Sequence, residues 1–446
     1  MSTRTTSLLD ELTWRGLLHQ YTEGLAEWLA GGPVTAYCGF DPTAPSLHVG
    51  SLVPVMGLVH LQRAGHRPVA LVGGGTGMIG DPSGKSTERT LNSYEVVEAN
   101  ARGIHAQLER FLEFDGPNAA LMRDNAAWLL PLGAVEFMRD VGKHFTVNYM
   151  LAKESVKARM EAGISYTEFS YMLLQAYDYL ELHRREGATL QIGGSDQWGN
   201  ITAGIELIRR VEGAEAHALT LPLLTTATGT KFGKTEGGAV WLDPARTSPY
   251  QFFQFWINTD DRDVGRFLRF FTFQSREEIE ALERETAEHP ERRTAQHALA
   301  MDVTTRVHGA DQAAVADEVS GILFGRGDPA SLSREALHAL AAEIPFAEMA
   351  WAAGGVVAAG GGHAAPPADE GERGRSINLP DALVTLGLVK SKGEARRVLQ
   401  QGGITVNGAR ASAETSALRV DAALHGGYFL IRKGGRSFGL VRAGGG

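Results

Sequence analysis

The first half of the chain alternates short apolar runs with segments of helical periodicity. Residues 34–38 and 68–73 are apolar enough to form buried strands, and each is followed by a turn and then by apolar residues at helical spacing. Further strands are predicted at 190–192 and 218–221, and further helices at 94–114, 134–139 and 167–184. Strands that alternate with helices predict an α/β domain with a parallel sheet.

Beyond residue 241 the pattern becomes helical. Ser248 and Pro249 stand in the order of an N-cap and a first helical residue. Ser275 and Glu278, three residues apart, match a capping box ahead of a further helix. We therefore predict a helical domain after the α/β domain.

Composition marks two more parts. Residues 351–374 are rich in Gly, Ala and Pro, which predicts a flexible linker. The predicted organisation is an α/β domain at 1–247, a helical domain at 248–345, the linker at 346–374 and a small module at 375–446. A chain of 446 residues with 43% hydrophobic content can fill two to four such domains.

Charge is distributed unevenly along the chain. The net charge is −9, yet residues 371–446 hold twelve Lys or Arg against five Asp or Glu, or +7, which leaves −16 to residues 1–370. A basic tail on an acidic body predicts that the tail meets a polyanion.

Cysteine and histidine usage excludes several classes of protein. Cys38 is the single cysteine, so an intramolecular disulfide is excluded, and no apolar run approaches the ~20 residues that span a bilayer. The fourteen histidines are scattered, without CxxC or HExxH, which disfavours a protein-ligated zinc. With no apolar or arginine-rich leader, the expected location is the cytoplasm.

Residues 37–51 (YCGFDPTAPSLHVGS) place a turn between a strand and a helix start near His48 and Gly50. A helix start offers unpaired N–H groups and the positive end of a dipole, which favour a phosphate. Gly50 would let a flat ring approach the backbone. When this segment is considered alone, a purely structural histidine is the favoured explanation.

Residues 73–86 (GGGTGMIGDPSGKS) resemble two nucleotide-binding motifs without completing either. The glycines at 75, 77 and 80 fit GxGxxG, but no acidic residue ends a second strand about 20 residues later. Ile79 stands where a phosphate loop ending at 84–86 needs glycine. A backbone-exposing loop with Asp81 and Lys85 remains, suited to a zwitterion and a phosphate, or to a solvated turn.

Two other stretches carry candidate chemistry. Tyr171, Gln175 and Asp178 recur at i, i+4 and i+7, which places three polar side chains on one helix face. That face would line a pocket, with Asp178 accepting a hydrogen bond from a ligand hydroxyl, or would lie in solvent. Lys231 and Lys234 stand in a loop of small residues that could close over a triphosphate, or form a surface turn.

Together these segments resemble the bacterial tyrosyl-tRNA synthetases, which are class I enzymes. Residues 42–51 match the family's HIGH region and 231–235 (KFGKT) its KMSKS loop, while GDPSGK, YMLLQAYDY and IGGSDQWGN are strings typical of the tyrosine enzymes. The resemblance covers essentially the whole chain. It implies a Rossmann-type catalytic domain, a helical domain on the anticodon side and a C-terminal RNA-binding domain.

The resemblance also implies the substrates and the residues that bind them. L-tyrosine would react with ATP, accompanied by Mg²⁺, and then pass to tRNA(Tyr), with no organic cofactor and no protein-ligated metal. The residues implied for tyrosine are Tyr37, Asp81, Tyr171, Gln175, Asp178 and Gln197. Those implied for ATP are Gly39, Asp41, Pro42, His48, Gly50, Ser51, Lys85, Gly194, Asp196, Lys231, Phe232, Lys234 and Thr235, and the catalytic set is Thr43, His48, Lys231 and Lys234.

The chain departs from the family pattern at two places. The HIGH motif ends in Ser51 instead of histidine, so a ribose contact from that position would pass to a shorter hydroxyl. The second motif reads KFGKT, which keeps both lysines. Neither change removes a group that the proposed chemistry needs.

The tail resembles the alpha-L RNA-binding fold shared with a small-subunit ribosomal protein. Residues 402–408 match its strand and tight turn. Lys390, Lys392, Arg396 and Arg397 lie along one helical stretch, as phosphate contacts would. Removal of 371–446 is therefore predicted to spare tyrosyl-adenylate formation and to impair transfer to RNA.

Two alternatives share part of this pattern. A tryptophanyl-tRNA synthetase would have the same fold and chemistry, although Asp178 within the string YMLLQAYDY favours tyrosine as the substrate. A synthetase-like RNA-binding protein without catalysis is the other, although both lysines and His48 are present. The family also implies a homodimer formed through residues 134–160.

Overall fold

The computed structural model describes residues 7–83, 91–153, 163–230, 232–235, 238–351, 375–412 and 417–444, with the single positions 156, 157, 160 and 415. The chain forms two compact units. The first comprises residues 1–248 and 255–307, and the second comprises 249–254 and 308–446. One boundary between the two units, between residues 254 and 255, lies inside a single helix, α11 (Pro249–Ile257).

A six-stranded sheet forms the centre of the first unit. Its order is β1-β6-β5-β2-β3-β4, with β1 antiparallel and the other pairs parallel. The strands are β1 (Gln20–Tyr21), β2 (Thr35–Phe40), β3 (Arg67–Val72), β4 (Leu121–Asp124), β5 (Ala188–Gly194) and β6 (His217–Leu221). β2 and β3 are buried along almost their whole length, as expected for parallel strands covered on both faces.

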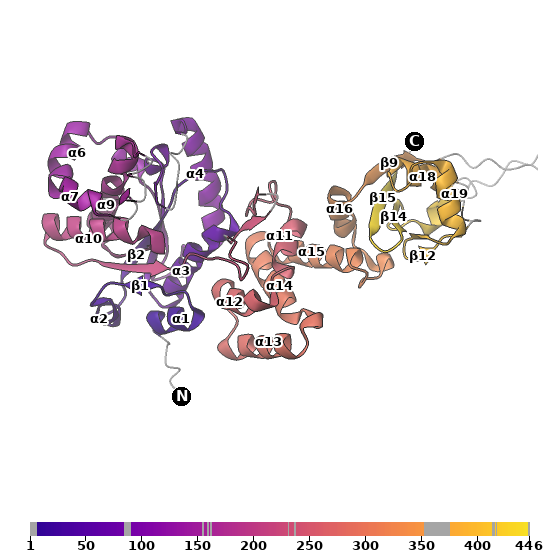
Figure 1. Cartoon of the computed structure of the whole chain (residues 1–446), viewed down its shortest axis with the longest axis horizontal. Coiled ribbons are helices and arrows are strands. Elements are labelled where there is room, and N and C mark those ends of the chain that lie inside the picture. Colours follow the sequence, from indigo (N-terminus) through magenta and orange to yellow (C-terminus); the bar gives the residue numbers. More distant parts are fainter. Residues whose placement is uncertain are drawn as a thin grey trace, which may run out of the picture. The chain divides into compact units, whose positions relative to one another are not determined.

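Helices cover both faces of this sheet. Figure 1 shows α9 (Tyr166–Glu186) and α10 (Trp198–Glu212) on one side and α3 (Leu52–Arg63) and α4 (Tyr94–Leu108) on the other. Shorter helices are α1 (Leu8–Arg15), α2 (Leu25–Ala30), α5 (Ala126–Leu129), α6 (Ala134–Asp140) and α7 (Val147–Leu151). β2 lies between strands whose connections run in opposite directions, which makes it the switch point where ligands bind in such sheets.

The predicted strands and the predicted helices at 134–139 and 167–184 are confirmed, with ends shifted by a few residues. The helix predicted at 94–114 is also present, but it ends at Leu108. β1 and β4 were not predicted. β4 reads LMRD and is only half-buried, so it lacks the continuous apolar run that marks β2 and β3.

The first unit also contains helices α12 (Asp261–Phe271), α13 (Arg276–Glu288) and α14 (Thr294–His308), with α11 (Pro249–Ile257) shared between the units. The capping box of Ser275 and Glu278 is confirmed, because both of its hydrogen bonds are present. Phe232 inserts its ring among Phe255, Trp256, Phe267 and Phe271, with centroids 4.9–5.8 Å away. This aromatic cluster anchors the segment that carries the predicted lysine loop.

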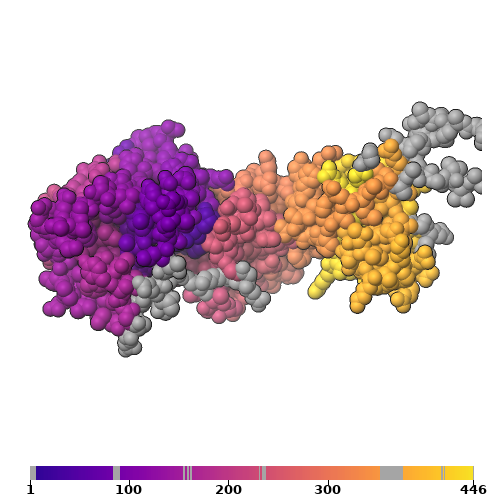
Figure 2. Space-filling view, turned by 90° about the horizontal axis from the view of Figure 1, so that it is seen from above, coloured from indigo at the N-terminus to yellow at the C-terminus, as the bar shows by residue number. Residues whose placement is uncertain are grey.

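The second unit joins two helices to a small mixed domain. Its main sheet has the order β12-β11-β14-β15-β9, in which β9 pairs in parallel with β15. Its elements are α15 (Ala310–Leu323), α16 (Arg334–Glu343), β9 (Phe346–Ala350), β10 (Ser376–Asn378), α18 (Leu379–Thr385), α19 (Lys392–Gln400), β11 (Ile404–Val406), β12 (Ala409–Arg410), β13 (Ala417–Arg419), β14 (Tyr428–Lys433) and β15 (Ser437–Gly444). The tight turn at 407–408 is confirmed, with positive φ at both Asn407 and Gly408. The orange helices and the yellow tail of this unit form one packed body (Figure 2).

Two features differ from the predicted domain limits. Residues 346–350, assigned to the linker, form β9, because pairing with β15 satisfies their backbone groups. The helical region 248–345 is not one compact unit, since α15 and α16 pack their apolar faces on Leu430, Phe438 and Leu440 of the tail. The rest of the predicted linker, 352–374, lies outside the described residues.

Over the part of the chain that the structure describes, no helix is both long and apolar enough to cross a membrane. Cys38 is buried, and burial raises the pKa of its thiol to about 12. The thiol therefore stays protonated at neutral pH and is a poor nucleophile.

Candidate active site

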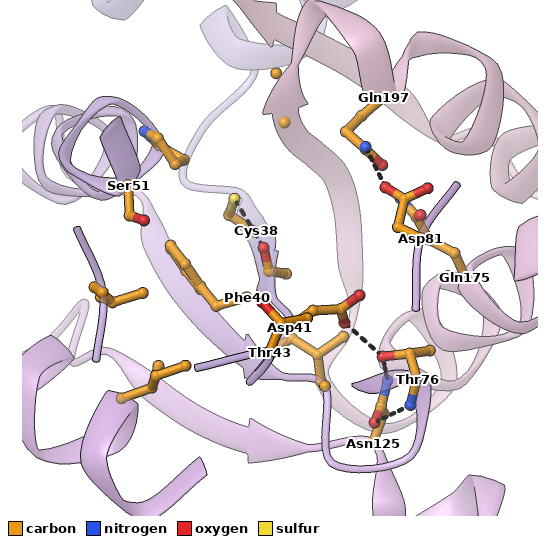
Figure 3. Close-up of a pocket in the computed structure, with 18 of the residues that line it drawn as sticks. Cys38, Phe40, Asp41, Thr43, Ser51, Thr76, Asp81, Asn125, Gln175 and Gln197 are labelled. Atoms are coloured by element: carbon orange, nitrogen blue, oxygen red, sulfur yellow. Dashed lines mark hydrogen bonds between the residues drawn. The ribbon is translucent and has the colours of Figure 1, made fainter. Parts of the chain in front are cut away.

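A cavity of about 340 Å³ opens at the carboxyl ends of the parallel strands. Its walls come from the ends of β2, β3 and β5, from residues that follow β4, and from α9. This is the switch point of the sheet, where the loops diverge and leave a crevice. Figure 3 shows Asp41, Thr76 and Asn125 joined by hydrogen bonds in one part of the wall and Asp81 and Gln197 joined in another.

Asp178 lies fully buried at the deep end of the cavity and receives two N–H donors. Trp128 Nε1 donates to its Oδ1 at 2.7 Å, and Asn125 Nδ2 donates to its Oδ2 at 2.9 Å. Burial raises the pKa of Asp178 to about 8, although the two hydrogen bonds act to lower it. The pair of donors fixes the orientation of the carboxylate toward the cavity.

Tyr37 lies on β2 and lines the same cavity as Asp178 of α9. Its side chain is 1% exposed, and its hydroxyl makes no hydrogen bond to any described residue. Burial, with a further contribution from the negative charge of Asp178, raises the pKa of Tyr37 well above its ordinary value. A neutral buried hydroxyl without a partner beside a buried carboxylate is matched to a ligand group that can donate and accept, such as a phenol.

Asp41 connects β2 to α9 through Tyr171. The Tyr171 hydroxyl donates to Asp41 Oδ2 at 2.7 Å, and Thr76 Oγ1 donates to Asp41 Oδ1 at 2.8 Å. Burial raises the pKa of Tyr171 well above its ordinary value, with Asp41 as the next cause. Asp41 therefore orders the wall near Tyr171 in addition to any role toward ATP.

A third carboxylate, that of Asp81, lies on the side of the cavity near α10. Gln197 Nε2 donates to Asp81 Oδ2 at 2.5 Å. Asn200 Nδ2 donates to Gln175 Oε1 at 3.0 Å and to Gln197 Oε1 at 3.2 Å. The arrangement brings Asp81, Gln175 and Gln197 together from loop, helix and turn, which provides acceptors suited to an ammonium group.

The helix start at His48 forms where it was predicted, as a 3₁₀ turn Val49–Ser51 that leads into α3. Its backbone donors are not open to a phosphate, however. Val49 N donates to Val240 O, Gly50 N to His48 Nδ1 and Ser51 N to His48 O. The prediction that these backbone N–H groups bind an anion is therefore wrong. Because Nδ1 of His48 accepts from Gly50 N, the proton of a neutral His48 ring lies on Nε2.

A second cavity of about 320 Å³ adjoins the first. The two share the lining residues Gly39, Phe40, Asp41, Leu47, His48, Ser51, Pro54 and Gly194. The other walls of the second cavity are mostly apolar side chains: Gly50, Val53, Asp196, Leu221, Pro222, Leu223, Leu224 and Phe232. Such a space suits a flat ring, with Asp196 and Ser51 as polar groups for a sugar.

The structure brings most of the predicted ligand residues together. Thr43, Gly39, Ser51 and Gly194 line the first cavity with the tyrosine set, and Gly50, Asp196 and Phe232 line the second. Pro42 lines neither cavity: its carbonyl accepts from Asn100 Nδ2, so it holds the loop from behind. Lys85 and Lys231 lie outside the described residues, and for Lys234 and Thr235 only the backbone, in β7 (Lys234–Thr235), is described.

Several residues of the site had escaped the sequence reasoning. Asn125 is 1% exposed and, besides Asp178, holds the loop after β3 by accepting from Gly75 N at 2.7 Å. Asp124 accepts from Gly74 N in the same way. The available signal was the polar pair Asp124-Asn125 at the end of a strand, but β4 itself was not predicted. Gly73 and Gly74 lie against the carboxylates of Asp41 and Asp124. The loop forms a short 3₁₀ turn, not a dinucleotide-binding helix start.

The four basic residues predicted to contact RNA lie in the second unit. Lys390, Lys392, Arg396 and Arg397 are all exposed, on α19 or just before it. Lys392 pairs with Asp381. The other three guanidinium or ammonium groups project from the surface of the tail.

Comparison with known proteins places both units in one family. A family model described as tRNA synthetases class I (W and Y) matches residues 29–325. A second, described as Tyrosine--tRNA ligase SYY-like C-terminal domain, matches residues 366–441. A C-terminally truncated mitochondrial tyrosyl-tRNA synthetase of Aspergillus nidulans has a similar structure, with a TM-score of 0.65 and 32% identity over 71% of this chain and 94% of its own.

Curated relatives extend over nearly the whole chain. The tyrosine--tRNA ligase of Anaeromyxobacter dehalogenans strain 2CP-1 is 55% identical over 98% of this chain and 99% of its own length. That of Thermobifida fusca is 53% identical with the same coverage. The tryptophanyl and non-catalytic alternatives are not favoured by these relatives. The chain belongs to the class I tRNA synthetases of the tryptophan and tyrosine type and, within them, to the tyrosine--tRNA ligases.

Proposed function

We propose that this protein activates L-tyrosine with ATP to form tyrosyl-adenylate and pyrophosphate, and then transfers tyrosine to the 3′ end of tRNA(Tyr). The proposal rests on the two side chains at the deep end of the first cavity, Tyr37 and Asp178. A buried tyrosine hydroxyl, which has no hydrogen-bond partner among the described residues, lies there beside a buried carboxylate whose two oxygens are fixed by N–H donors. That combination matches a phenol.

Tyrosine would lie along the first cavity. Its phenol would donate to Asp178 and accept from Tyr37, and its ammonium group would meet Asp81, Tyr171 and Gln175. Gln197, bonded to Asp81, would orient the carboxylate toward the second cavity. The two cavities share Asp41 and His48, so the carboxylate would point to the place where the two substrates meet.

ATP, with its Mg²⁺, would enter as a substrate. The adenosine would occupy the second cavity near Gly50, Gly194 and Asp196. Thr43 and His48 would bind the phosphates as charge develops on the leaving pyrophosphate, joined by Lys231 and Lys234 from the closing loop. Lys85 would add a further positive charge.

The chemistry needs positioning and charge neutralisation instead of a base. The carboxylate of tyrosine is already ionised at neutral pH and attacks the α-phosphate, and the bond from that phosphorus to the bridging oxygen breaks as pyrophosphate leaves. In the second step the terminal ribose hydroxyl of the RNA attacks the carbonyl carbon and AMP leaves. Transition-state charge is stabilised by fixed donors, which is the main contribution such sites make.

Discrimination against phenylalanine follows from the same residues. Phenylalanine would leave Tyr37 and Asp178 buried without a ligand partner, and unpaired buried polar groups are unfavourable. Rejection of phenylalanine is a known property of tyrosyl-tRNA synthetases, and these two residues account for its direction in this chain.

ATP–pyrophosphate exchange tests the proposal across the twenty amino acids. Exchange that depends on L-tyrosine and is lost or loses selectivity in Asp178→Ala supports it. Exchange with tryptophan in place of tyrosine, or unchanged tyrosine/phenylalanine selectivity in the variant, would contradict it.

Further parts of the proposal concern assembly and RNA. The region around α6 and α7 exposes Val135 (79%), Met138 (58%) and Val147 (62%), apolar residues that a second copy of the chain would cover in a homodimer. The basic residues of α19 would contact the phosphates of tRNA(Tyr). A cytoplasmic location agrees with the single buried cysteine.

A further inference from the structure

A groove of about 830 Å³ lies within the second unit, whereas the catalytic cavities belong to the first. Four segments form it: the end of α15, the end of α16, the turn after α18 and the hairpin between β14 and β15. All of them belong to the same compact unit. The groove is larger than either catalytic cavity.

The floor of the groove is apolar and its lip carries an exposed aromatic ring. Leu386, Leu388 and Phe438 are buried beneath it. Phe324, which follows α15, lines the groove and is 59% exposed. A ring that remains this exposed beside an apolar floor offers one face for stacking by a flat ligand.

The hairpin side of the groove is basic. Arg436 is exposed and, among the described residues, makes no hydrogen bond or ion pair. Lys433 also lines the groove but is already engaged, donating to Leu388 O at 2.6 Å and to Glu394 Oε1 at 3.2 Å. The opposite side presents Glu343, a carboxylate that accepts from Gln251.

We propose that this groove binds one unpaired nucleotide of the RNA substrate, with its base stacked on Phe324 and its phosphate held by Arg436. Unpaired bases bind proteins through aromatic stacking combined with cationic contacts to the backbone. The net charge of +7 in residues 371–446 is complementary to that backbone. The inference rests on the proposed function, because tRNA(Tyr) is taken as the RNA.

Position 324 gives the sharper test, since its side chain is exposed and can be changed without opening the core. Phe324→Leu keeps an apolar side chain and removes the ring, whereas Phe324→Tyr keeps the ring. We expect Phe324→Leu to raise the KM for a tRNA(Tyr) transcript about tenfold in aminoacylation and Phe324→Tyr to leave it unchanged. Tyrosine-dependent pyrophosphate exchange should be unchanged in both.

Arg436→Ala should raise the same KM and reduce its dependence on salt concentration. Arg442→Ala is the matched control. Arg442 is another exposed arginine at the same end of the chain, but it pairs with Glu348 and does not line the groove. We expect no change in KM for this control.

A direct binding measurement distinguishes the binding of an unpaired nucleotide from a general affinity for RNA. A single-stranded oligoribonucleotide that contains 2-aminopurine should lose fluorescence on the intact protein and on Phe324→Tyr, but not on Phe324→Leu. The same oligomer annealed to its complement should not respond.

Equal KM values for Phe324→Leu and the unmodified protein would overturn the inference, as would an equal rise in Arg442→Ala. Either result would leave the proposed catalysis intact, because pyrophosphate exchange needs no RNA. Absence of that exchange in the unmodified protein would instead contradict the proposed function.

Discussion

Asp178 predicts how tyrosine binding depends on pH. Its pKa of about 8 is raised by burial, and a bound tyrosine favours the ionised form, because its phenol donates to the carboxylate and its ammonium adds positive charge. Binding therefore lowers this pKa and releases a proton. The affinity for tyrosine should rise with pH, by up to about tenfold per unit, and level off above about pH 8.

The measurement is the dissociation constant of L-tyrosine from about pH 6 to about pH 8. L-phenylalanine is the matched ligand, because it carries the same ammonium group without the phenol. Its profile should be flatter. Profiles of equal slope for the two ligands would show that the phenol does not meet Asp178.

Asn125→Ala should weaken both the fold and the site. The change removes the donor to Asp178 and to Thr76 Oγ1 and the acceptor for Gly75 N, so three buried residues lose a partner. We expect the free energy of unfolding to fall by about 3 kcal/mol and the KM for tyrosine to rise. Denaturant unfolding and pyrophosphate exchange measure the two effects.

Asn118→Ala provides the control for that change. Asn118 donates to the backbone carbonyls of Gln62 and His66 in the same unit, away from the cavity. Its loss should reduce stability and leave the KM for tyrosine unchanged. A similar rise in KM in both variants would mean that Asn125 acts only through general stability.

At the scale of single residues, the sequence predicts side chains that share one element better than contacts between elements. Helical spacing alone placed Tyr171, Gln175 and Asp178 on one face, and α9 presents all three to the cavity. The hydrogen bond from Trp128 to Asp178 joins residues 50 positions apart in the sequence. Only the sheet brings those two together, so no local pattern could indicate it.

At the scale of elements, α12 holds the start of the loop that carries the two predicted catalytic lysines. Asp263 is 4% exposed, and its Oδ2 accepts from Ala227 N at 2.8 Å. Arg266 links the same carboxylate to Thr225 O. The base of the loop is therefore fixed on both the polar side and, through Phe232, the aromatic side of this helix.

Asp263→Ala should therefore slow tyrosyl-adenylate formation without weakening tyrosine binding. We expect kcat for pyrophosphate exchange to fall about tenfold, because small displacements of catalytic groups have large effects on rate. The KM for tyrosine should not change. Asp260→Ala at the N-cap of the same helix is the control: it costs about 1 kcal/mol of stability, and Asp260 makes no hydrogen bond to the described residues of the loop. A fall in kcat in both variants would point to the stability of α12 instead of the loop.

The predictability of the elements depended on their apolar pattern. β2, β3, β5 and β6 are buried strands and were predicted from composition. β9 reads FAEMA between a helix and a glycine-rich stretch, and only its pairing with β15, about 90 residues away, makes it a strand. Tertiary pairing of this kind leaves no local signal.

At the scale of the whole molecule, the packing of the second unit changes how the role of the tail can be tested. Tyr428, Leu430, Phe438 and Leu440 form one apolar cluster with residues of α15 and α16. Removing 371–446, the cut that the sequence suggested, would expose those helix faces. Loss of activity would then follow from misfolding as readily as from loss of RNA contacts.

Charge reversal in the intact chain avoids that difficulty. Arg396 and Arg397 are exposed on α19, so Arg396→Glu with Arg397→Glu changes the surface without removing a core residue. We expect the KM for tRNA(Tyr) to rise at least about tenfold and its salt dependence to weaken, because fewer phosphates are neutralised. Tyrosine-dependent pyrophosphate exchange should remain unchanged.

The control carries the same change in net charge elsewhere on the tail. Arg419→Glu with Arg442→Glu reverses two exposed arginines that already pair with Asp421 and Glu348. If phosphates bind along α19, the control should raise the KM much less than the α19 variant. Equal effects would mean that the tail attracts RNA only through its total charge, and a loss of pyrophosphate exchange in the α19 variant would mean that the two catalytic steps are not divided between the units.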